Sequence, residues 1–248
     1  VAVAHFDVSE KLSDCFTIGL SLVSENEIKN PEELIEKEGL LTIAGNLGDR
    51  YFHGVINNFM LSGRNGRFYL YQATMVPALW FLILNQDCRI FQNKTVPDIV
   101  KEILKDNNID ANHYEFRLKE KYKERRNCVQ YRETDLGFIS RILEEEGIYY
   151  FFEHSKDKHL LVFVDSTVTY KPIEGVPILK HKSGGGMVAS EESISNFSLT
   201  QTVRPGLVVQ TAYNFKKPSM GQETKAQDET KHKYEMYDFP HTYGDPDD

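Results

Sequence analysis

Hydrophobic and polar positions alternate along the first third of the chain, which predicts β-strands. In residues 15–23, Phe16, Ile18, Leu20 and Leu22 alternate with small or polar residues. This period of two places one face of a strand against a core. The same pattern predicts further strands over residues 40–44, 51–61, 67–75 and 79–84.

Turn-forming and helix-capping residues separate these strands. Asn30 followed by Pro31 predicts the start of a short helix, which Gly39 would close in a left-handed conformation. The pair Asn65-Gly66 predicts a hairpin turn, because both residues tolerate positive φ.

The middle of the chain changes to a helical period. From Thr95 onward, hydrophobic residues recur every three or four positions, which predicts a helix with Thr95 as N-cap and Asp98 as the capping-box acid. A second helix is predicted over residues 134–146, with Gly147 closing its end. The aromatic run at residues 148–152 then predicts a strand, whose partner would follow a charged surface loop.

The last third returns to strands. The alternation in residues 197–203 and 209–215 predicts a pair of strands joined by a turn at residues 204–206. Residues 216–234 are polar and poor in aliphatic side chains, so a long loop or an extended excursion is predicted there.

This order of elements predicts a fold of the α+β class that is predominantly β. Two similar β-barrel-like modules would be separated by an insert that contains the helices. The predicted boundaries are residues 1–92 for the first module, 93–165 for the mixed α/β insert and 166–248 for the second module.

Composition and charge exclude several classes of protein. The 248 residues carry 29 Lys and Arg against 37 Asp and Glu, a net charge of −8, which disfavours nucleic acid as a partner. No apolar run approaches the roughly 20 residues that cross a bilayer, and no Sec-type signal is visible, so a soluble chain is predicted.

The missing initial Met suggests a piece of a longer protein. Cys15, Cys88 and Cys128 are predicted to be reduced, buried thiols.

Candidate chemistry is weak, and no cofactor or metal site is predicted. The three glutamates at residues 144–146 predict a solvated helix end, and the three glycines at 184–186 predict a flexible linker. The basic residues in 119–126 predict a solvated face. His154 and His159 fall in the predicted surface loop, without a nearby Cys to suggest zinc.

An enzyme remains the alternative of another class. It would be a β-rich hydrolase of cell-wall glycans that uses Glu146 with Asp165. Such a pair must lie about 5 to 9.5 Å apart in an open cleft.

Several motifs are too specific to reflect composition. They are CRIFQNKTVPDIV at residues 88–100, CVQYRETDL at 128–136, FISR at 138–141 and EEEGIYYFFEH at 144–154. These motifs resemble the VgrG family, the spike proteins of type VI secretion systems, which are related to the baseplate hub of contractile phage tails. The segments DRYFHG, GRFYLY and PALW before residue 81, and YEMYDFP at 234–240, extend the resemblance over nearly the whole chain.

The resemblance implies a structural function rather than an enzyme. In that family this region is a trimeric hub, in which two β modules per chain make a ring of six. The ring docks on a hexameric, Hcp-like tail-tube protein and carries the membrane-puncturing tip, and effector cargo is a further partner. The alternative within the same class is the baseplate hub of a phage or prophage tail. The oligonucleotide-binding-type barrel and β-helix needle that follow in the family are absent from these residues.

The resemblance also implies a location and a set of signature positions. The protein would be made in the bacterial cytoplasm without a Sec signal, assembled on the tail tube and exported to the extracellular space or a target cell. The signature positions with an expected structural role are Arg89, Phe91, Gln92, Tyr131, Glu133, Asp135, Glu146 and Gly147. Among these, Arg89 is expected to form an ion pair with Glu133 and Asp135.

Overall fold

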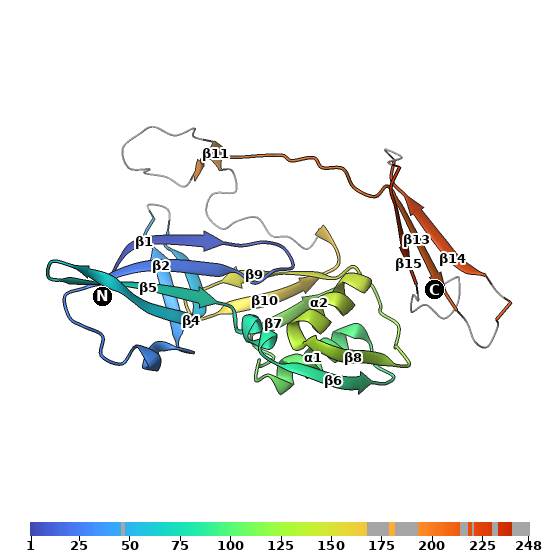
Figure 1. Cartoon of the computed structure of the whole chain (residues 1–248), viewed down its shortest axis with the longest axis horizontal. Coiled ribbons are helices and arrows are strands. Elements are labelled where there is room, and N and C mark those ends of the chain that lie inside the picture. Colours follow the sequence, from blue (N-terminus) through green and yellow to red (C-terminus); the bar gives the residue numbers. More distant parts are fainter. Residues whose placement is uncertain are drawn as a thin grey trace. The chain divides into compact units, whose positions relative to one another are not determined.

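The computed structural model describes residues 1–45, 48–167, 179–181, 193–213, 218–219, 221–229 and 233–239. These residues form two compact units (Figure 1). Strands β1 to β10 and all the helices belong to the first unit, and strands β11 to β15 belong to the second. The predicted fold class is confirmed, because the described chain is mostly strand with a few helices.

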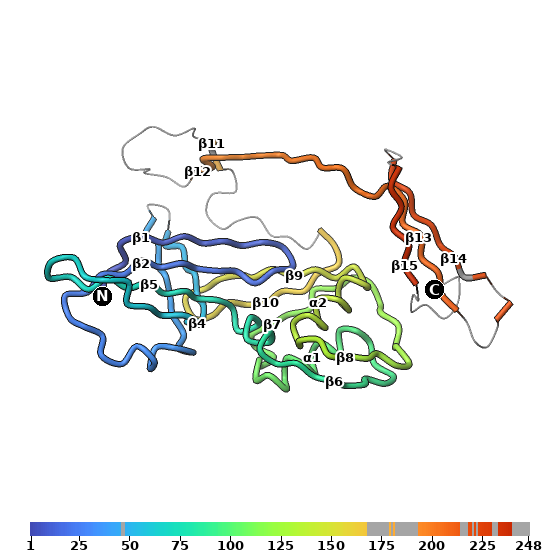
Figure 2. Tube along the Cα trace, viewed as in Figure 1, coloured from blue at the N-terminus to red at the C-terminus, as the bar shows by residue number. Residues whose placement is uncertain are grey.

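A five-stranded antiparallel sheet opens the first unit. Its order is β1-β2-β5-β4-β3, and it curls into a half-barrel (Figure 2). Because β2 pairs with β5, the sheet joins two strands that are far apart in the chain. The strand bounds are Ala2–Ser9 for β1, Thr17–Ser24 for β2, Glu38–Ile43 for β3, Arg50–Asn65 for β4 and Phe68–Val76 for β5.

The alternating pattern of the sequence explains the inner face of this sheet. Phe16 and Ile18 are fully buried, and they pack with Leu41, Phe52 and Met75 from the neighbouring strands. The predicted hairpin turn is confirmed between β4 and β5, but its two turn residues are Gly66, with φ +57°, and Arg67, because Asn65 still pairs with Phe68.

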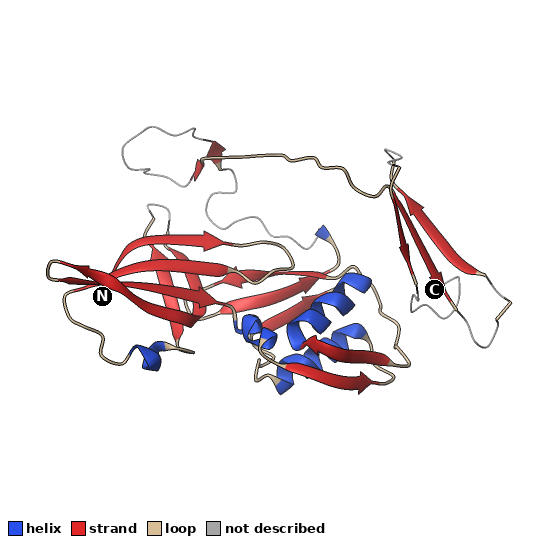
Figure 3. Cartoon of the chain, viewed as in Figure 1, coloured by secondary structure: helices blue, strands red, loops and turns tan. Residues whose placement is uncertain are grey.

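The rest of the first unit surrounds a second core. Helices α1 (Val96–Asp106) and α2 (Asp135–Glu145) pack between a three-stranded sheet and a two-stranded ribbon (Figure 3). The sheet has the order β7-β10-β9, and the ribbon pairs β6 with β8. The strand bounds are Tyr114–Arg117 for β7, His159–Val164 for β10, Tyr149–His154 for β9, Gln86–Phe91 for β6 and Cys128–Thr134 for β8.

A threonine side chain caps the N-terminus of each α-helix, as predicted for Thr95. Thr95 Oγ1 accepts a hydrogen bond from the Asp98 N–H at 3.3 Å, and Thr134 Oγ1 accepts one from the Gly137 N–H at 3.0 Å. Each bond satisfies one backbone donor that has no partner inside its helix.

Gly147 ends α2 in the left-handed conformation that the sequence predicted, with φ +68°. Its N–H donates to the Glu144 carbonyl, and the Ile148 N–H donates to the Leu143 carbonyl. This pair of bonds is the Schellman motif, which turns the chain sharply from α2 into β9.

Gly147→Val is expected to lower the free energy of unfolding by about 1 kcal/mol or more, because a β-branched residue is strained at positive φ. No atom lies within 4 Å of the added Cβ position, so the loss measures backbone strain alone. Gly147→Asn is the matched control and should lose less, because Asn tolerates this conformation. Equal urea midpoints for the wild type and the Val variant would contradict the assignment.

Two predictions for the first unit are wrong. The segment after Asn30 forms only a 3₁₀ turn, η1 (Pro31–Leu34), without a side-chain cap, and Gly39 lies inside β3. A Cβ on Gly39 would lie 2.4 Å from Met75 Sδ, so this glycine permits close packing rather than helix closure. Residues 79–84 form a 3₁₀ helix, η2 (Ala78–Ile83), rather than a strand, and buried Leu79 and Leu82 follow its three-residue period.

The second unit holds two small sheets. Strand β11 (Lys180–His181) pairs in parallel with β12 (Ser193–Ile194), and the other sheet has the order β14-β13-β15. The bounds of its strands are Gln222–Gln227 for β14, Leu207–Ala212 for β13 and Glu235–Asp238 for β15.

One prediction for this region is also wrong. Residues 197–203 form no strand, and Phe197 is 81% exposed. Strand β13 pairs instead with β14 and β15. The segment 216–234, for which a long loop or an extended excursion is predicted, contains the extended strand β14. The linker predicted at residues 184–186 lies outside the described residues. The module boundaries at residues 92 and 165 stay predictions, although the β6–β8 pairing crosses residue 92.

Candidate functional site

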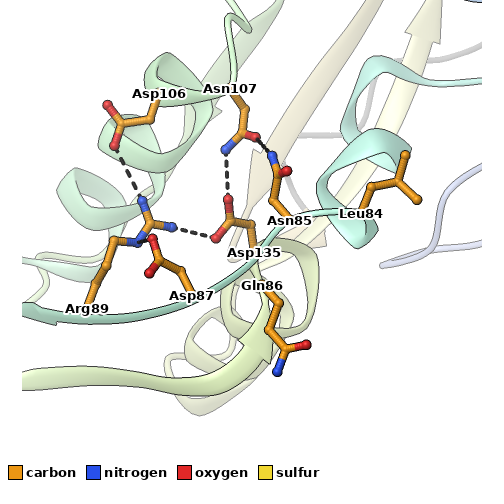
Figure 4. A pocket seen from close by; sticks show the side chains of 8 residues that line it. All are labelled: Leu84, Asn85, Gln86, Asp87, Arg89, Asp106, Asn107 and Asp135. Carbon is orange, nitrogen blue, oxygen red and sulfur yellow. Dashed lines mark hydrogen bonds and ion pairs between the residues drawn. The ribbon is translucent and has the colours of Figure 1, made fainter.

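Two of the predicted signature residues, Arg89 and Asp135, meet at the start of α2 (Figure 4). Asp135 is only 4% exposed. Its Oδ1 accepts bonds from Arg89 Nη2 at 2.5 Å and from Gln130 Nε2 at 2.8 Å, and its Oδ2 accepts one from Asn107 Nδ2 at 2.9 Å. The carboxylate also lies at a helix N-terminus, where the helix dipole favours negative charge. These partners stabilise a buried charge that would otherwise be costly.

Arg89 connects this carboxylate to three other elements. The side chain extends from β6 and is 23% exposed. Its Nε donates to Gln130 Oε1 at 3.0 Å, and its Nη1 donates to Asp106 Oδ2 at 3.4 Å, at the end of α1. Asp87 Oδ2 also lies 3.3 Å from Nε. A planar guanidinium suits this arrangement, because its five donors point in fixed directions.

A surface pocket of about 410 Å³ lies over this network, between η2 and the end of α1. Asn85 Nδ2 donates to Asn107 Oδ1 at 2.5 Å along its wall. The charged groups of the wall are bonded to one another (Figure 4). Together with the bond from Arg89 to Gln130 on β8, the network joins β6, β8, α1 and α2. The arrangement can hold these four elements in one geometry.

The expected ion pair of Arg89 is therefore present with Asp135 but not with Glu133. Glu133 Oε1 instead accepts a bond from Arg141 Nη2 at 2.6 Å. The same Arg141 donates to Glu145 Oε1 at 3.0 Å, one helical turn away.

Glu146 belongs to a second charged network. Arg125 donates to Glu146 Oε1 at 2.6 Å and to Glu145 Oε2 at 2.5 Å. The predicted solvated basic face is wrong at this residue, because the Arg125 side chain is mostly buried against α2. The predicted solvated helix end agrees with the exposure of Glu144 and Glu145, whereas Glu146 is half-buried, and Glu145 and Glu146 also bind Arg125 of a preceding loop.

The three remaining signature residues lie in different surroundings. Phe91 is buried and stacks on Phe138, with ring centroids 5.6 Å apart. Gln92 Nε2 donates to Asn127 Oδ1 at 3.0 Å on the surface. Tyr131 is 65% exposed, and the Arg132 guanidinium lies over its ring. The signature thus combines core residues with an outward-facing aromatic.

The residues of the enzyme alternative already have structural partners. Asp165 accepts hydrogen bonds from the backbone N–H groups of Lys119 and Glu120 and from the Tyr122 hydroxyl. Burial acts to raise the pKa of Asp165, but these hydrogen bonds outweigh it and hold the pKa below its ordinary value. A glycosidase acid needs a raised pKa, and Glu146 is held by Arg125, so neither residue suits that role.

Two predictions about single residues are wrong. His154 and His159 do not lie in a surface loop, because they face each other on paired strands β9 and β10 and are buried. Of the three thiols predicted to be buried, Cys88 is exposed, because it occupies an outward position on β6. Burial raises the pKa of the Cys15 thiol to about 12, and nearby Asp14 adds to the shift.

In the part of the chain that the structure describes, no group of three or more His, Cys, Asp or Glu side chains has the geometry to hold a metal ion. The described helices include none that is long and apolar enough to cross a membrane.

The first unit thus joins a half-barrel sheet to an insert that internal ion pairs hold together. Residues 9–248 match the family described as the phage tail baseplate hub, and the chain belongs to that family. The type VI secretion system spike protein VgrG1a of Pseudomonas aeruginosa is 34% identical over 245 residues, covering 94% of this chain and 37% of that protein. VgrG1c of the same organism is 34% identical over 238 residues, covering 94% and 32%.

A solved structure supports the same relationship. The Escherichia coli c3393 protein, described as a component of the type VI secretion system with structural similarity to the phage T4 tail proteins gp27 and gp5, aligns with a TM-score of 0.62 at 29% identity. The alignment covers 67% of this chain and 48% of that one. The resemblance to VgrG proteins is thus confirmed, and the chain spans about a third of the length of the two Pseudomonas relatives.

Sequence reasoning missed part of the site. Gln130 and Asn107 complete the bonds of Asp135, yet isolated amide side chains carry no pattern that predicts a buried partner. His53 was also missed, although it shares a buried contact with His159.

Proposed function

We propose that this protein is the hub of a trimeric spike in a type VI secretion system, where it docks on the hexameric tail tube and carries the membrane-puncturing tip. The observation that carries this proposal is the 34% identity to a secretion spike protein over 94% of the chain. The structural similarity to the Escherichia coli secretion component supports the same machine.

The edges of the five-stranded sheet support assembly with other chains. Strands β1 and β3 are its outer strands, so each has one edge that pairs with no strand among the described residues. Exposed edges are commonly covered by a neighbouring subunit, and a closed ring repeats one contact around its axis. Three chains with two modules each would present six similar units to a sixfold tube.

The proposed function requires no catalysis. The relatives are structural spike and hub proteins, and the candidate acids of this chain are engaged in internal bonds. The proposed partners are two further copies of the chain, an Hcp-like tube protein, the protein's own needle region and effector cargo. Export by the injection machine itself, without a Sec signal, completes the proposal.

A phage or prophage baseplate hub is the second candidate, favoured by the description of the matching family. The two candidates share the same assembly physics and differ in the machine that uses it. Neighbouring genes distinguish them, because secretion genes support the first candidate and capsid and tail-fibre genes support the second.

Light scattering coupled to size exclusion tests the trimer. The full-length gene product that contains these residues should have the mass of three chains at micromolar concentration. The 248-residue chain, measured alongside it, shows how much of the association the hub itself supplies. A full-length protein that stays monomeric at every concentration would contradict the proposal.

A further inference from the structure

Three buried histidines meet where the five-stranded sheet contacts the β7-β10-β9 sheet. His53 lies on β4, and His154 and His159 lie opposite each other on β9 and β10. His53 Nδ1 is 3.0 Å from His159 Nδ1, and the backbone N–H of His53 donates to His154 Nδ1 at 3.2 Å. The N–H of Ala78, at the start of η2, donates to His159 Nε2 at 3.0 Å. Imidazoles therefore link four elements of the first unit.

The bonds require all three rings to be neutral. His159 Nε2 accepts from a backbone N–H, so the proton of the neutral ring is on Nδ1 and donates to His53 Nδ1. His53 then carries its own proton on Nε2. His154 Nδ1 accepts from the other backbone N–H, so its proton is on Nε2 as well. A second proton on any ring would replace an acceptor with a donor and turn one hydrogen bond into a repulsion.

The surroundings of the cluster are mainly aromatic. The Phe16 ring centroid lies 4.7 Å from that of His154 and 5.5 Å from that of His159, and the Phe52 ring lies 5.2 Å from His154. Such a wall offers no hydrogen-bond acceptor to an additional ring proton.

Few charged groups face the three rings. Glu38 Oε2 is 3.9 Å from His53 Nε2, and Glu10 Oε1 is 3.2 Å from His154 Nε2 but out of line for a hydrogen bond. His113 and Asp157 act on His53 from a greater distance, and His113 also acts on His159. No carboxylate contributes to the environment of His159, the deepest ring of the three.

Burial and the neighbouring histidines act in the same direction on His159. Burial lowers the pKa of His159 to about 3, and repulsion from His53 and His154 adds to the effect. Burial also lowers the pKa of His53, although Glu38 opposes it. Because the pKa values of His159 and His53 are lower in the folded state than in the unfolded state, the folded state binds fewer protons in acid. The stability of the folded state is therefore greatest above pH 6.5 and declines as the pH falls toward 3.

We infer that this cluster is an acid-sensitive latch between the five-stranded sheet and the β7-β10-β9 sheet, closed while its three imidazoles are neutral and opened by protonation of His159 and His53. The latch differs from the ion-pair networks of the insert, which use carboxylates and weaken only when those are protonated. It also stands independently of the proposed function, because it depends only on contacts within the first unit.

Amide hydrogen exchange followed by nuclear magnetic resonance tests the latch directly. The amides of Ala78 and His53 donate to imidazole nitrogens, so each reports on one ring. Corrected for intrinsic chemical rates, the protection of the Ala78 amide should fall roughly thirtyfold between pH 8 and pH 5. This factor is expected when one histidine with an ordinary pKa near 6.5 takes up a proton on opening.

Substitutions assign the effect to particular rings. In His159→Gln, the side-chain oxygen can still accept the bond from the Ala78 N–H but does not titrate, so the acid-dependent loss at Ala78 should fall well below thirtyfold. His53→Asn keeps an acceptor at the Nδ1 position and should reduce the loss, which provides a second test if the first variant does not fold. His5→Gln, on the exposed strand β1, is the matched control and should behave as the wild type.

Equal corrected protection at pH 8 and pH 5 in the wild type would overturn the latch. An acid response that is the same in the wild type, His159→Gln and His53→Asn would overturn it as well, because the titrating group would then lie elsewhere.

Discussion

Arg89→Ala is expected to lower the free energy of unfolding by about 3 kcal/mol, which is the effect of removing one partner from a buried ion pair. The change leaves the Asp135 carboxylate buried, with bonds only from Gln130 and Asn107. It also separates β6 from the end of α1, because Asp106 loses its partner. Urea denaturation followed by circular dichroism measures the loss.

Two further variants separate charge from geometry. Arg89→Lys keeps the charge but not the planar set of donors, so it should lose less than Arg89→Ala. Adding Asp135→Asn to Arg89→Ala removes the uncompensated charge and should recover part of the loss, as a double-mutant cycle would show. A loss below about 1 kcal/mol for Arg89→Ala would show that the two amides alone satisfy Asp135.

Phe16→Ala is expected to cost about 4 kcal/mol, within the range for large-to-small changes at fully buried aromatic positions. Phe16 is completely buried, and its ring packs edge-on against Phe152 at 5.0 Å between centroids. It also contacts the histidine cluster, so the cavity would open between the two sheets of the first unit. Thermal and urea unfolding should both show the loss.

Phe6→Ala is the matched control for this substitution. Phe6 lies on the outer strand β1 and is 38% exposed, so its loss should stay near 1 kcal/mol or below. Phe16→Leu should fall between the two, because it retains most of the buried apolar volume. Equal losses for Phe6→Ala and Phe16→Ala would contradict the central packing position given to Phe16.

The sequence predicted the elements that depend on local patterns. The capping Thr95, the closing glycine of α2 and the hairpin turn at Gly66 act within a few residues, so their effect can be read from the chain itself. The alternating residues of β2 are equally local, and their apolar side faces the core. Helix α1 was predicted correctly for the same reason, because its hydrophobic residues recur at helical spacing.

The errors occur where distant partners decide the structure. Residues 79–84 are apolar enough for a strand, but they pack on α2 and the insert core as a 3₁₀ helix. Residues 197–203 alternate as a strand would, but β13 takes its partners from β14 and β15 instead. Alternation cannot indicate which of several candidate strands will pair.

The candidate site shows the same division. The ion pair between Arg89 and Asp135 was expected from the family resemblance. Glu133 pairs with Arg141 instead of Arg89, and this pairing depends on the bulge that sets the β6–β8 register. The histidine cluster joins residues more than a hundred positions apart in the chain. Single histidines at such separations carry no signal until the fold brings them together.

Native mass spectrometry of the protein bound to its tail-tube protein tests the central claim most directly. The full-length gene product would be mixed with the hexameric tube protein encoded in the same genome, and the intact complex would be weighed. The proposed function predicts three copies of this chain for each ring of six tube subunits. A complex with one or six copies per ring, or no complex at concentrations where the tube protein is hexameric, would contradict it.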